Sequence, residues 1–215
     1  MNWLGAFFVI ITGGLWFNYL HQPTTDPLQA YVIIEDESGH GSGVFISPTK
    51  VLTAKHVTEH ISETLRLRGP DGDIYHIVGA YDGPADISII EVDRPVKGVH
   101  LPISCRPLER GERLRYFGSP GAMEFIGPVD LSVIGSYKSA PSLLDEEPEM
   151  VDSTTLVEGE AEPGASGSGV LDSENRVVGV FNFAWNGTTF GGFVSLSFAP
   201  VCQWVLEELQ QGANV

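Results

Sequence analysis

The chain has 215 residues, enough to bury one substantial core or two small cores packed together. Its 28 acidic and 12 basic side chains give a formal net charge of −16, and a surface of that sign repels phosphate backbones, which argues against nucleic acid as a partner. Two cysteines are too few for a small disulfide-stapled scaffold, whereas 25 glycines and 14 prolines among short Val-, Ile-, Phe- and Tyr-rich runs favour many short strands joined by turns.

The N-terminal segment is apolar. Residues 3–20 contain no Lys, Arg, Asp or Glu, and this run is just long enough to cross a bilayer. A cleavable signal peptide usually begins with positive charge and ends at a small-x-small site, and neither is clear here. We therefore expect residues 1–22 to be an anchor rather than a removed signal, residues 23–29 to be a polar tether, and the protein to be membrane-anchored or exported with its main domain outside the cytoplasm. An apolar helix packed on the protein is the alternative.

Six short runs between residues 30 and 103 have the composition of strands. Gly69-Pro70-Asp71-Gly72 is a strong turn signal between the fourth and fifth runs and predicts a hairpin there. The predicted strands are Tyr31–Ile34, Gly41–Ile46, Val51–Ala54, Leu65–Arg68, Asp73–Tyr81 and Ile87–Val92.

A second set of six strands is predicted after a connecting segment that begins near His100. Asn186-Gly187 predicts a tight hairpin turn between the last two strands. The acidic stretch Ser139–Met150 is predicted as an exposed loop, and Pro200–Gln211 as a helix with four apolar residues on one face: Cys202, Val205, Leu206 and Leu209. The predicted strands are Arg113–Gly118, Pro128–Tyr137, Ser153–Val157, Gly169–Leu171, Val177–Phe183 and Phe190–Leu196. This strand count by itself supports only an all-β sandwich or barrel.

Three separate blocks carry residues suited to nucleophilic catalysis. Ser166 lies in a glycine-rich stretch, where the backbone can bend sharply and nearby N–H groups can face a developing oxyanion. A serine hydroxyl needs a base, and His56 ends the block Thr53-Ala54-Lys55-His56. The imidazole in turn needs a carboxylate, and Asp86 precedes an alternating apolar run. Asp82 is the reserve, although no such run follows it directly.

These three blocks, in this order, resemble the active-site blocks of the trypsin-like, chymotrypsin-fold serine peptidases of the compact bacterial or viral type. The resemblance covers about residues 30–210. It implies an all-β fold with two packed six-stranded antiparallel β-barrels and a short C-terminal helix. The peptidase domain would span residues 30–212, with barrel 1 over about 30–103, barrel 2 over about 110–199 and the helix over about 200–211.

The same resemblance implies a serine endopeptidase that acts on protein or peptide substrates through an acyl-enzyme, with no cofactor and no metal. His56 would be the base, Asp86 the acid and Ser166 the nucleophile, and the oxyanion hole would be formed by the backbone N–H groups of Gly164 and Ser166. Ser168 also lies between glycines, but the residue two positions before it is a serine, so it fails the family's Gly-x-Ser-Gly pattern.

Substrate-pocket residues follow only by analogy. Glu160, six residues before the nucleophile, would lie near the base of the S1 pocket, with Asn182, Ala184 and Gly192 in its walls; small side chains there suggest an open pocket. Nearby acids could favour Lys or Arg at P1, or could point outward. The family also implies that Cys105 and Cys202 come close enough to form a disulfide, and two unpaired thiols are the alternative.

Two other functions compete with this one. His56-Val57-Thr58-Glu59-His60 spells the H-x-x-E-H zinc-peptidase pattern, which requires a long helix, yet His56 follows a β-type run and the Ser166 block would be left unexplained. A catalytically silent trypsin-like fold used as a binding module is the second alternative. Such relatives usually lack one member of the triad, and this chain has all three.

Overall fold

The computed structural model describes residues 26–35, 39–59, 65–119, 126–142, 149–160, 164–185 and 188–211. The predicted anchor therefore lies outside the described residues, and among those described no helix is both long and apolar enough to span a membrane. The last residues of the predicted tether form a short 3-10 helix, η1 (Pro27–Ala30). Asp26 caps it by accepting a hydrogen bond from the backbone N–H of Leu28, and Pro27 suits the first helical position.

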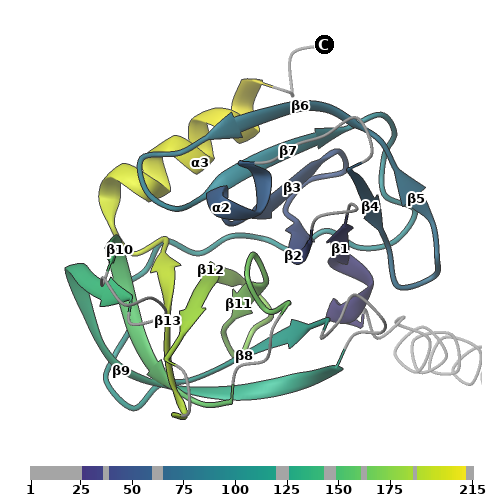
Figure 1. Cartoon of the computed structure of the whole chain (residues 1–215). Helices are drawn as coiled ribbons and strands as arrows, with labels where there is room; N and C mark the ends of the chain where they lie inside the picture. The colour runs from purple at the N-terminus through teal and green to yellow at the C-terminus, as the bar shows by residue number, and fades with distance from the viewer. Residues whose placement is uncertain are drawn as a thin grey trace, which may run out of the picture.

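The first half of the chain forms a seven-stranded antiparallel sheet in the order β5-β4-β1-β2-β3-β7-β6, with the short helix α2 (Lys55–Thr58) after β3 (Figure 1). The predicted hairpin is confirmed, since Arg68 pairs with Ile74 and Gly72 has a φ of 83°. The predicted strand Asp73–Tyr81 is divided at His76, which is why the sheet has seven strands rather than six. The strands are β1 (Tyr31–Glu35), β2 (His40–Phe45), β3 (Lys50–Thr53), β4 (Arg66–Arg68), β5 (Ile74–Tyr75), β6 (Ile77–Asp82) and β7 (Ser88–Val92).

The second half forms a closed antiparallel barrel in the order β10-β13-β12-β11-β8-β9, below the first sheet in Figure 1. The expected all-β fold of two barrel-like sheets with a short C-terminal helix is thus confirmed. The strands are β8 (Arg113–Gly118), β9 (Ile126–Ser142), β10 (Glu149–Glu158), β11 (Gly169–Leu171), β12 (Val177–Ala184) and β13 (Phe190–Ser195).

The predicted exposed loop Ser139–Met150 is wrong at both ends. β9 continues to Ser142 and β10 begins at Glu149, and the two strands pair there, with Ala140 opposite Val151. Ala140 is buried and Val151 packs against the core, so apolar burial extends the ladder past the acidic stretch that suggested a loop. Residues 143–148 lie outside the described residues. The predicted Asn186-Gly187 turn does too, although β12 and β13 pair beside it, Ala184 with Gly191.

One hydrophobic cluster runs through both sheets. It joins buried residues of β1 to β3, such as Val32 and Leu52, to buried residues of the second barrel, such as Leu171 and Val194. Tyr31 ties the two halves together, because it is fully buried and its hydroxyl donates a hydrogen bond to the carbonyl of Gly169 on β11. Burial raises the pKa of Tyr31, so the phenol keeps its proton and remains a donor. The two barrels therefore form one packed unit.

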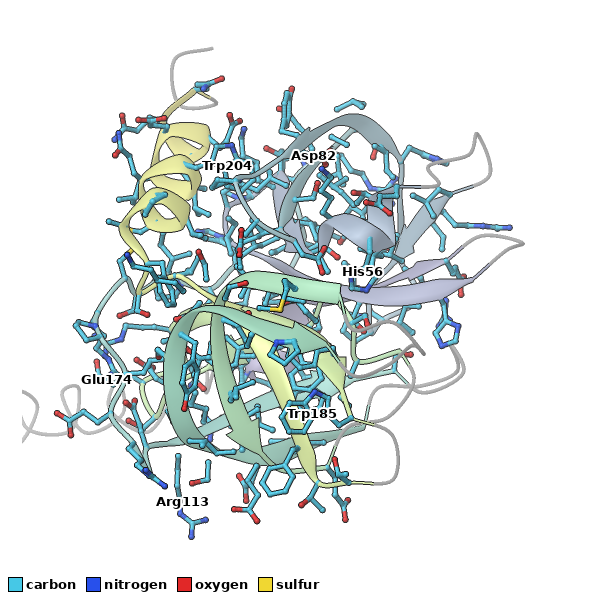
Figure 2. The ribbon with its side chains drawn as sticks, turned by 60° about the vertical axis from the view of Figure 1, so that its left-hand side comes forward. His56, Asp82, Arg113, Glu174, Trp185 and Trp204 are labelled. Atoms are coloured by element: carbon cyan, nitrogen blue, oxygen red, sulfur yellow. A yellow bond between two sulfur atoms is a disulfide. The ribbon has the colours of Figure 1, made fainter. Side chains whose placement is uncertain are left out.

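Helix α3 (Ala199–Gln211) lies along the first sheet (Figures 1 and 2). Its buried face consists of Val201 and Val205, whereas Leu206 is 43% exposed, so the predicted face is wrong for Leu206. Trp204 packs onto the loop between β6 and β7: a Cβ added to Gly83 would lie 2.8 Å from two carbons of the indole. A disulfide between Cys105 and Cys202 ties the first turn of α3 to the segment that connects the barrels.

A buried carboxylate holds that connecting segment to the second barrel. Asp172 has no exposed side-chain surface and accepts hydrogen bonds from the backbone N–H groups of Glu174 (2.9 Å) and Arg176 (3.0 Å). The guanidinium groups of Arg176 and Arg106 lie 2.8 and 3.4 Å from its Oδ2. Burial opposes ionisation of Asp172, but the hydrogen bonds and the charge of Arg176 outweigh it, so the pKa of Asp172 lies below its ordinary value.

We expect the disulfide to contribute substantially to stability, because it closes a loop with a sequence separation of 97 residues and so restricts the unfolded chain. Replacing both cysteines with serine should lower the free energy of unfolding by about 2–4 kcal/mol in equilibrium urea unfolding. Reductant should lower the wild-type value to the same level and leave the double variant unchanged. Equal unfolding midpoints for the oxidised wild type and the double variant would contradict this expectation.

The Asp172 network should make stability fall in acid. Because folding lowers the pKa of Asp172, its contribution is complete above the ordinary value of about 3.9 and is lost as the pH falls through the lower folded value. Asp172→Asn should lower the free energy of unfolding by about 1–3 kcal/mol at pH 7 and flatten its pH dependence below about pH 5. Asp152→Asn on the exposed face of β10 is the matched control and should change neither. An unaltered acid unfolding curve for Asp172→Asn would refute the assignment.

Candidate active site

His56 and Asp86 come from two neighbouring connections of the first sheet. β3 ends at Thr53 and α2 begins at Lys55, which places His56 in the first helical turn, at the boundary between the two barrels (Figure 2). The Oδ1 of Asp86 accepts a hydrogen bond from the backbone N–H of His56 (3.0 Å), and the Oδ2 of Asp86 lies 2.7 Å from the Nδ1 of His56. A neutral imidazole that donates through Nδ1 leaves Nε2 free of its proton, which is the state that a general base requires.

Asp82, the reserve acid, is held elsewhere. Its Oδ1 accepts a hydrogen bond from the hydroxyl of Ser88 (2.7 Å), and its Oδ2 lies 3.5 Å from the ammonium of Lys55. Figure 2 shows Asp82 apart from His56. The carboxylate that contacts the imidazole is therefore that of Asp86.

Asn182 completes the surroundings of Asp86 from the second barrel. Its Nδ2 lies 2.7 Å from both the backbone carbonyl and the Oδ2 of Asp86, and its Oδ1 accepts from the backbone N–H of Val194 (2.7 Å). Burial opposes ionisation of Asp86, but hydrogen bonds from His56 and Asn182 and attraction to His56 outweigh it, and the pKa of Asp86 lies below its ordinary value. The carboxylate is thus charged at neutral pH.

The contact between Asn182 and Asp86 is a feature that sequence reasoning missed. Asn182 was expected in a wall of the S1 pocket, but its side chain is 3% exposed and engaged on both its nitrogen and its oxygen. The sequence did hold one signal for this contact: Asn182 is a single amide side chain within the apolar run of β12. A buried amide needs hydrogen-bond partners, so its position there indicates a polar contact.

The glycine-rich stretch forms a tight turn whose two serines differ in access. The hydroxyl of Ser166, which is partly exposed, donates a hydrogen bond to the backbone carbonyl of Asn182 (3.3 Å). Ser168 is fully buried and its hydroxyl donates to the carbonyl of Phe117 (2.8 Å). Gly164 and Gly167 have φ values of 97° and 86°, a conformation that glycine adopts without steric cost. The turn therefore presents Ser166, not Ser168, to solvent on the side of β12.

The other predicted pocket residues differ in their exposure and contacts. Glu160 is exposed, and its backbone carbonyl accepts a hydrogen bond from the hydroxyl of Tyr116 (2.9 Å). Ala184 is half-buried at the end of β12. Gly192 is buried, and a Cβ added to it would lie 2.5 Å from the ring of Phe183. That ring therefore occupies the space into which a side chain at this position would point.

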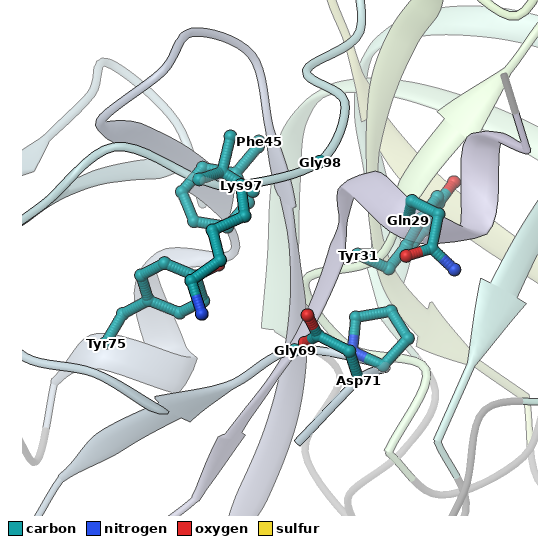
Figure 3. Close-up of a pocket in the computed structure, with 10 residues that line it drawn as sticks. Gln29, Tyr31, Phe45, Gly69, Asp71, Tyr75, Lys97 and Gly98 are labelled. Carbon is teal, nitrogen blue, oxygen red and sulfur yellow. The ribbon is translucent and has the colours of Figure 1, made fainter. Parts of the chain in front are cut away.

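A separate pocket lies on the first sheet (Figure 3). Phe45 and Tyr75 form its apolar wall, with their rings 5.2 Å apart, and Gln29, Asp71 and Lys97 contribute polar groups. No residue that lines it belongs to the predicted triad or to the predicted S1 pocket. It is therefore distinct from the site around His56.

The H-x-x-E-H pattern does not lie on a long helix. α2 contains only Lys55–Thr58, Glu59 follows its end, and His60 lies outside the described residues. His56 instead directs its Nδ1 to Asp86. The geometry that the zinc-peptidase pattern requires is therefore not that of this segment.

Comparison with known proteins gives a family match and several structural relatives. The family model of the trypsin-like peptidase domain matches residues 41–180, more than half of the chain and a range that contains His56, Asp86 and Ser166. The sequence is 27% identical over 151 residues to the peroxisomal leader peptide-processing protease of Mus musculus. The aligned residues make up 66% of this chain and 26% of that protein. The chain thus spans about a quarter of the length of that relative.

The chain also resembles solved structures of proteases, with low sequence identity to each of the three described below. The active form of the Rv3671c protease from M. tuberculosis matches with a TM-score of 0.68 and 22% identity, over 84% of this chain and 81% of that chain. An inactive form of Rv3671c matches with the same TM-score and identity, over 85% and 89%. The serine endoprotease from Yersinia pestis matches with a TM-score of 0.66 and 17% identity, over 85% and 63%. At these identities the likeness establishes the fold alone.

Proposed function

The chain belongs to the family of trypsin-like peptidases, and from that premise we propose that it is a serine endopeptidase that hydrolyses peptide bonds in peptides or proteins through Ser166, His56 and Asp86. The observation that carries the proposal is the contact between the Nδ1 of His56 and the Oδ2 of Asp86, 2.7 Å long. It supports a His56 ring in the tautomer that can accept a proton from a serine.

In the proposed reaction the Oγ of Ser166 attacks the carbonyl carbon of the scissile bond while the Nε2 of His56 takes its proton. The resulting oxyanion accepts hydrogen bonds from the backbone N–H groups of Gly164 and Ser166. His56 then gives the proton to the leaving amine, which departs and leaves an acyl group on Ser166. A water molecule, deprotonated by His56, attacks the acyl carbon and releases the second product.

Asp86 and Asn182 have supporting parts in this reaction. The negative charge of Asp86 stabilises the imidazolium that forms during each proton transfer, and it is available because its pKa is lowered. Asn182 donates to the same carboxylate oxygen that faces Nδ1, and it is itself held by Val194. It is a positioning residue that keeps the carboxylate from turning away from His56.

Replacing the nucleophile is the most direct test. Ser166→Ala should lower kcat for a fluorogenic peptide by a factor on the order of 10⁶ and abolish labelling by a fluorophosphonate probe, because the attacking hydroxyl is gone. Ser168→Ala is the matched variant in the same turn and should still be labelled, since its hydroxyl is buried against Phe117. A chelator should change neither reaction. Peptide hydrolysis that survives Ser166→Ala but is lost with chelator would refute the serine mechanism.

The pH dependence tests the His56–Asp86 pair. As the pH rises, kcat/KM should increase through the near-neutral range where imidazoles titrate, because only neutral His56 can accept a proton. Asp86 has a lowered pKa and stays charged throughout this range, so its titration should not add a second step there. Asp86→Asn should lower kcat by about 10⁴ at neutral pH, since an amide favours the wrong tautomer. A flat profile of kcat/KM between about pH 5 and 8 would contradict the role of His56.

A further inference from the structure

Ser42, on strand β2 of the first sheet, reaches across to the turn that carries Ser166. Its hydroxyl donates a hydrogen bond to the backbone carbonyl of Gly164 (2.7 Å), and its backbone N–H donates to the carbonyl of Ser166 (2.7 Å). Its own carbonyl accepts a hydrogen bond from the hydroxyl of Thr53 (2.7 Å). Ser42 is fully buried and all its polar groups are engaged, so its position is well determined.

The turn lies so close to neighbouring backbone that Gly164 and Gly167 have no room for a side chain. A Cβ added to Gly167 would lie 2.0 Å from the carbonyl oxygen of Ser42, and one added to Gly164 would lie 2.3 Å from the carbonyl oxygen of Ser119. Both neighbours are backbone atoms: Ser42 lies on β2 of the first barrel, and Ser119 directly follows β8 of the second barrel. The nucleophile turn is therefore closely packed against the backbone of both barrels, and Ser42 bonds to it from the first barrel.

The two hydrogen bonds from Ser42 flank an oxyanion donor. They hold the carbonyls of Gly164 and Ser166. These carbonyls belong to the 164–165 and 166–167 peptide units, and the Ser166 N–H lies in the 165–166 unit between them. Gly164 has a φ of 97° and, as a glycine, little intrinsic resistance to rotation of its peptide units. The bond from Ser42 therefore limits rotation of the peptide unit that follows Gly164, which is next to the unit that carries the Ser166 N–H.

Two residues beside the turn have buried polar groups of their own. Within the described part of the chain, the Nε2 of His40 and the Oγ of Ser119 are buried without a hydrogen-bond partner. Both residues border Gly164: an added Cβ there would lie 2.9 Å from the Nε2 of His40 and 2.3 Å from the carbonyl of Ser119. The hydroxyl of Ser42 is nevertheless the side-chain donor that bonds to the Gly164 carbonyl in the structure.

We propose that Ser42 is a positioning residue whose hydroxyl, supplied by the first barrel, holds the Gly164–Ser166 turn of the second barrel in the orientation that aims the Ser166 N–H, one of the two oxyanion donors, at the reacting carbonyl. The inference rests on the proposed serine mechanism and adds a residue outside the triad and the oxyanion hole. Any residue at this position supplies the backbone N–H, so the part specific to this sequence is the hydroxyl bond to Gly164.

The test compares Ser42→Ala with a matched buried serine. In Ser42→Ala, kcat for a fluorogenic peptide should fall about 10- to 100-fold with KM nearly unchanged, because a donor aimed at the transition state is weakened and not removed. The rate of labelling by a fluorophosphonate should fall by the same factor, and the midpoint of the pH profile should stay the same. Ser195→Ala is the control: this serine is also fully buried, and its hydroxyl bonds only to Ser197 at the end of β13.

The results separate a positioning role from a structural one. If Ser42→Ala lowers only the unfolding temperature, as the Ser195→Ala control should, while kcat and the labelling rate stay at the wild-type level, the proposal is wrong. Ser42→Cys keeps the volume and a weak donor, so it should fold even where Ser42→Ala does not, with intermediate kcat and labelling rate. Full wild-type kcat in Ser42→Cys and Ser42→Ala would also overturn it. Failure of the serine mechanism would instead be seen as activity retained in Ser166→Ala.

Discussion

The boundary between the two barrels is the constraint on which this site depends. His56 and Asp86 lie on connections of the first sheet, whereas Ser166 and Asn182 belong to the second barrel. Hydrogen bonds cross the boundary at Asn182 to Asp86 and at Ser42 to the nucleophile turn. Neither barrel alone contains both the base and the nucleophile, so the relative position of the two barrels sets the geometry of the proposed chemistry.

Polar groups are buried at that boundary, and burying a polar group is costly unless it has a hydrogen-bond partner. Asn182 meets this condition by bonding both to Asp86 and to Val194. The result is a tighter definition of geometry than apolar packing gives, because a hydrogen bond requires a direction as well as a distance. The same bonds overcome the cost of burying the charge of Asp86, and its pKa is lowered although burial would raise it.

Helix α3 packs against the loop that carries the acid. Trp204 lies against Gly83, at the start of the loop that carries Asp86, and the backbone N–H of Gly83 donates to the carbonyl of Ile87 (2.8 Å) at the end of that loop. The helix is held near one end by the disulfide and farther along by Glu208, whose carboxylate lies 3.9 Å from the ammonium of Lys50. The loop that carries Asp86 thus contacts the disulfide-linked helix at Gly83 and the second barrel at Asp86.

Local signals in the sequence predicted the strands, the hairpin at Gly69-Pro70-Asp71-Gly72 and the three blocks of candidate catalytic residues, because turn chemistry and apolar alternation act over a few residues. The contacts that complete the site join residues far apart in the chain: 96 positions separate Asp86 from Asn182, and 122 separate Ser42 from Gly164. No periodicity encodes such a pairing. The same limit explains the error at Leu206, whose helical spacing was compatible with a buried face, while the position of the first sheet decided that Val201 was buried instead.

The glycines around Ser166 illustrate how a local signal acquires a second meaning in the fold. From the sequence they indicate only a backbone free to bend. In the structure, Gly167 faces the carbonyl of Ser42 so closely that even a methyl group would collide with it. These glycines therefore serve the contact between the barrels as much as the turn itself, because they allow the nucleophile turn to approach β2 closely enough for the two bonds from Ser42. A larger residue at Gly164 or Gly167 would push the turn away from the neighbouring backbone, and the direction of the oxyanion donors would change.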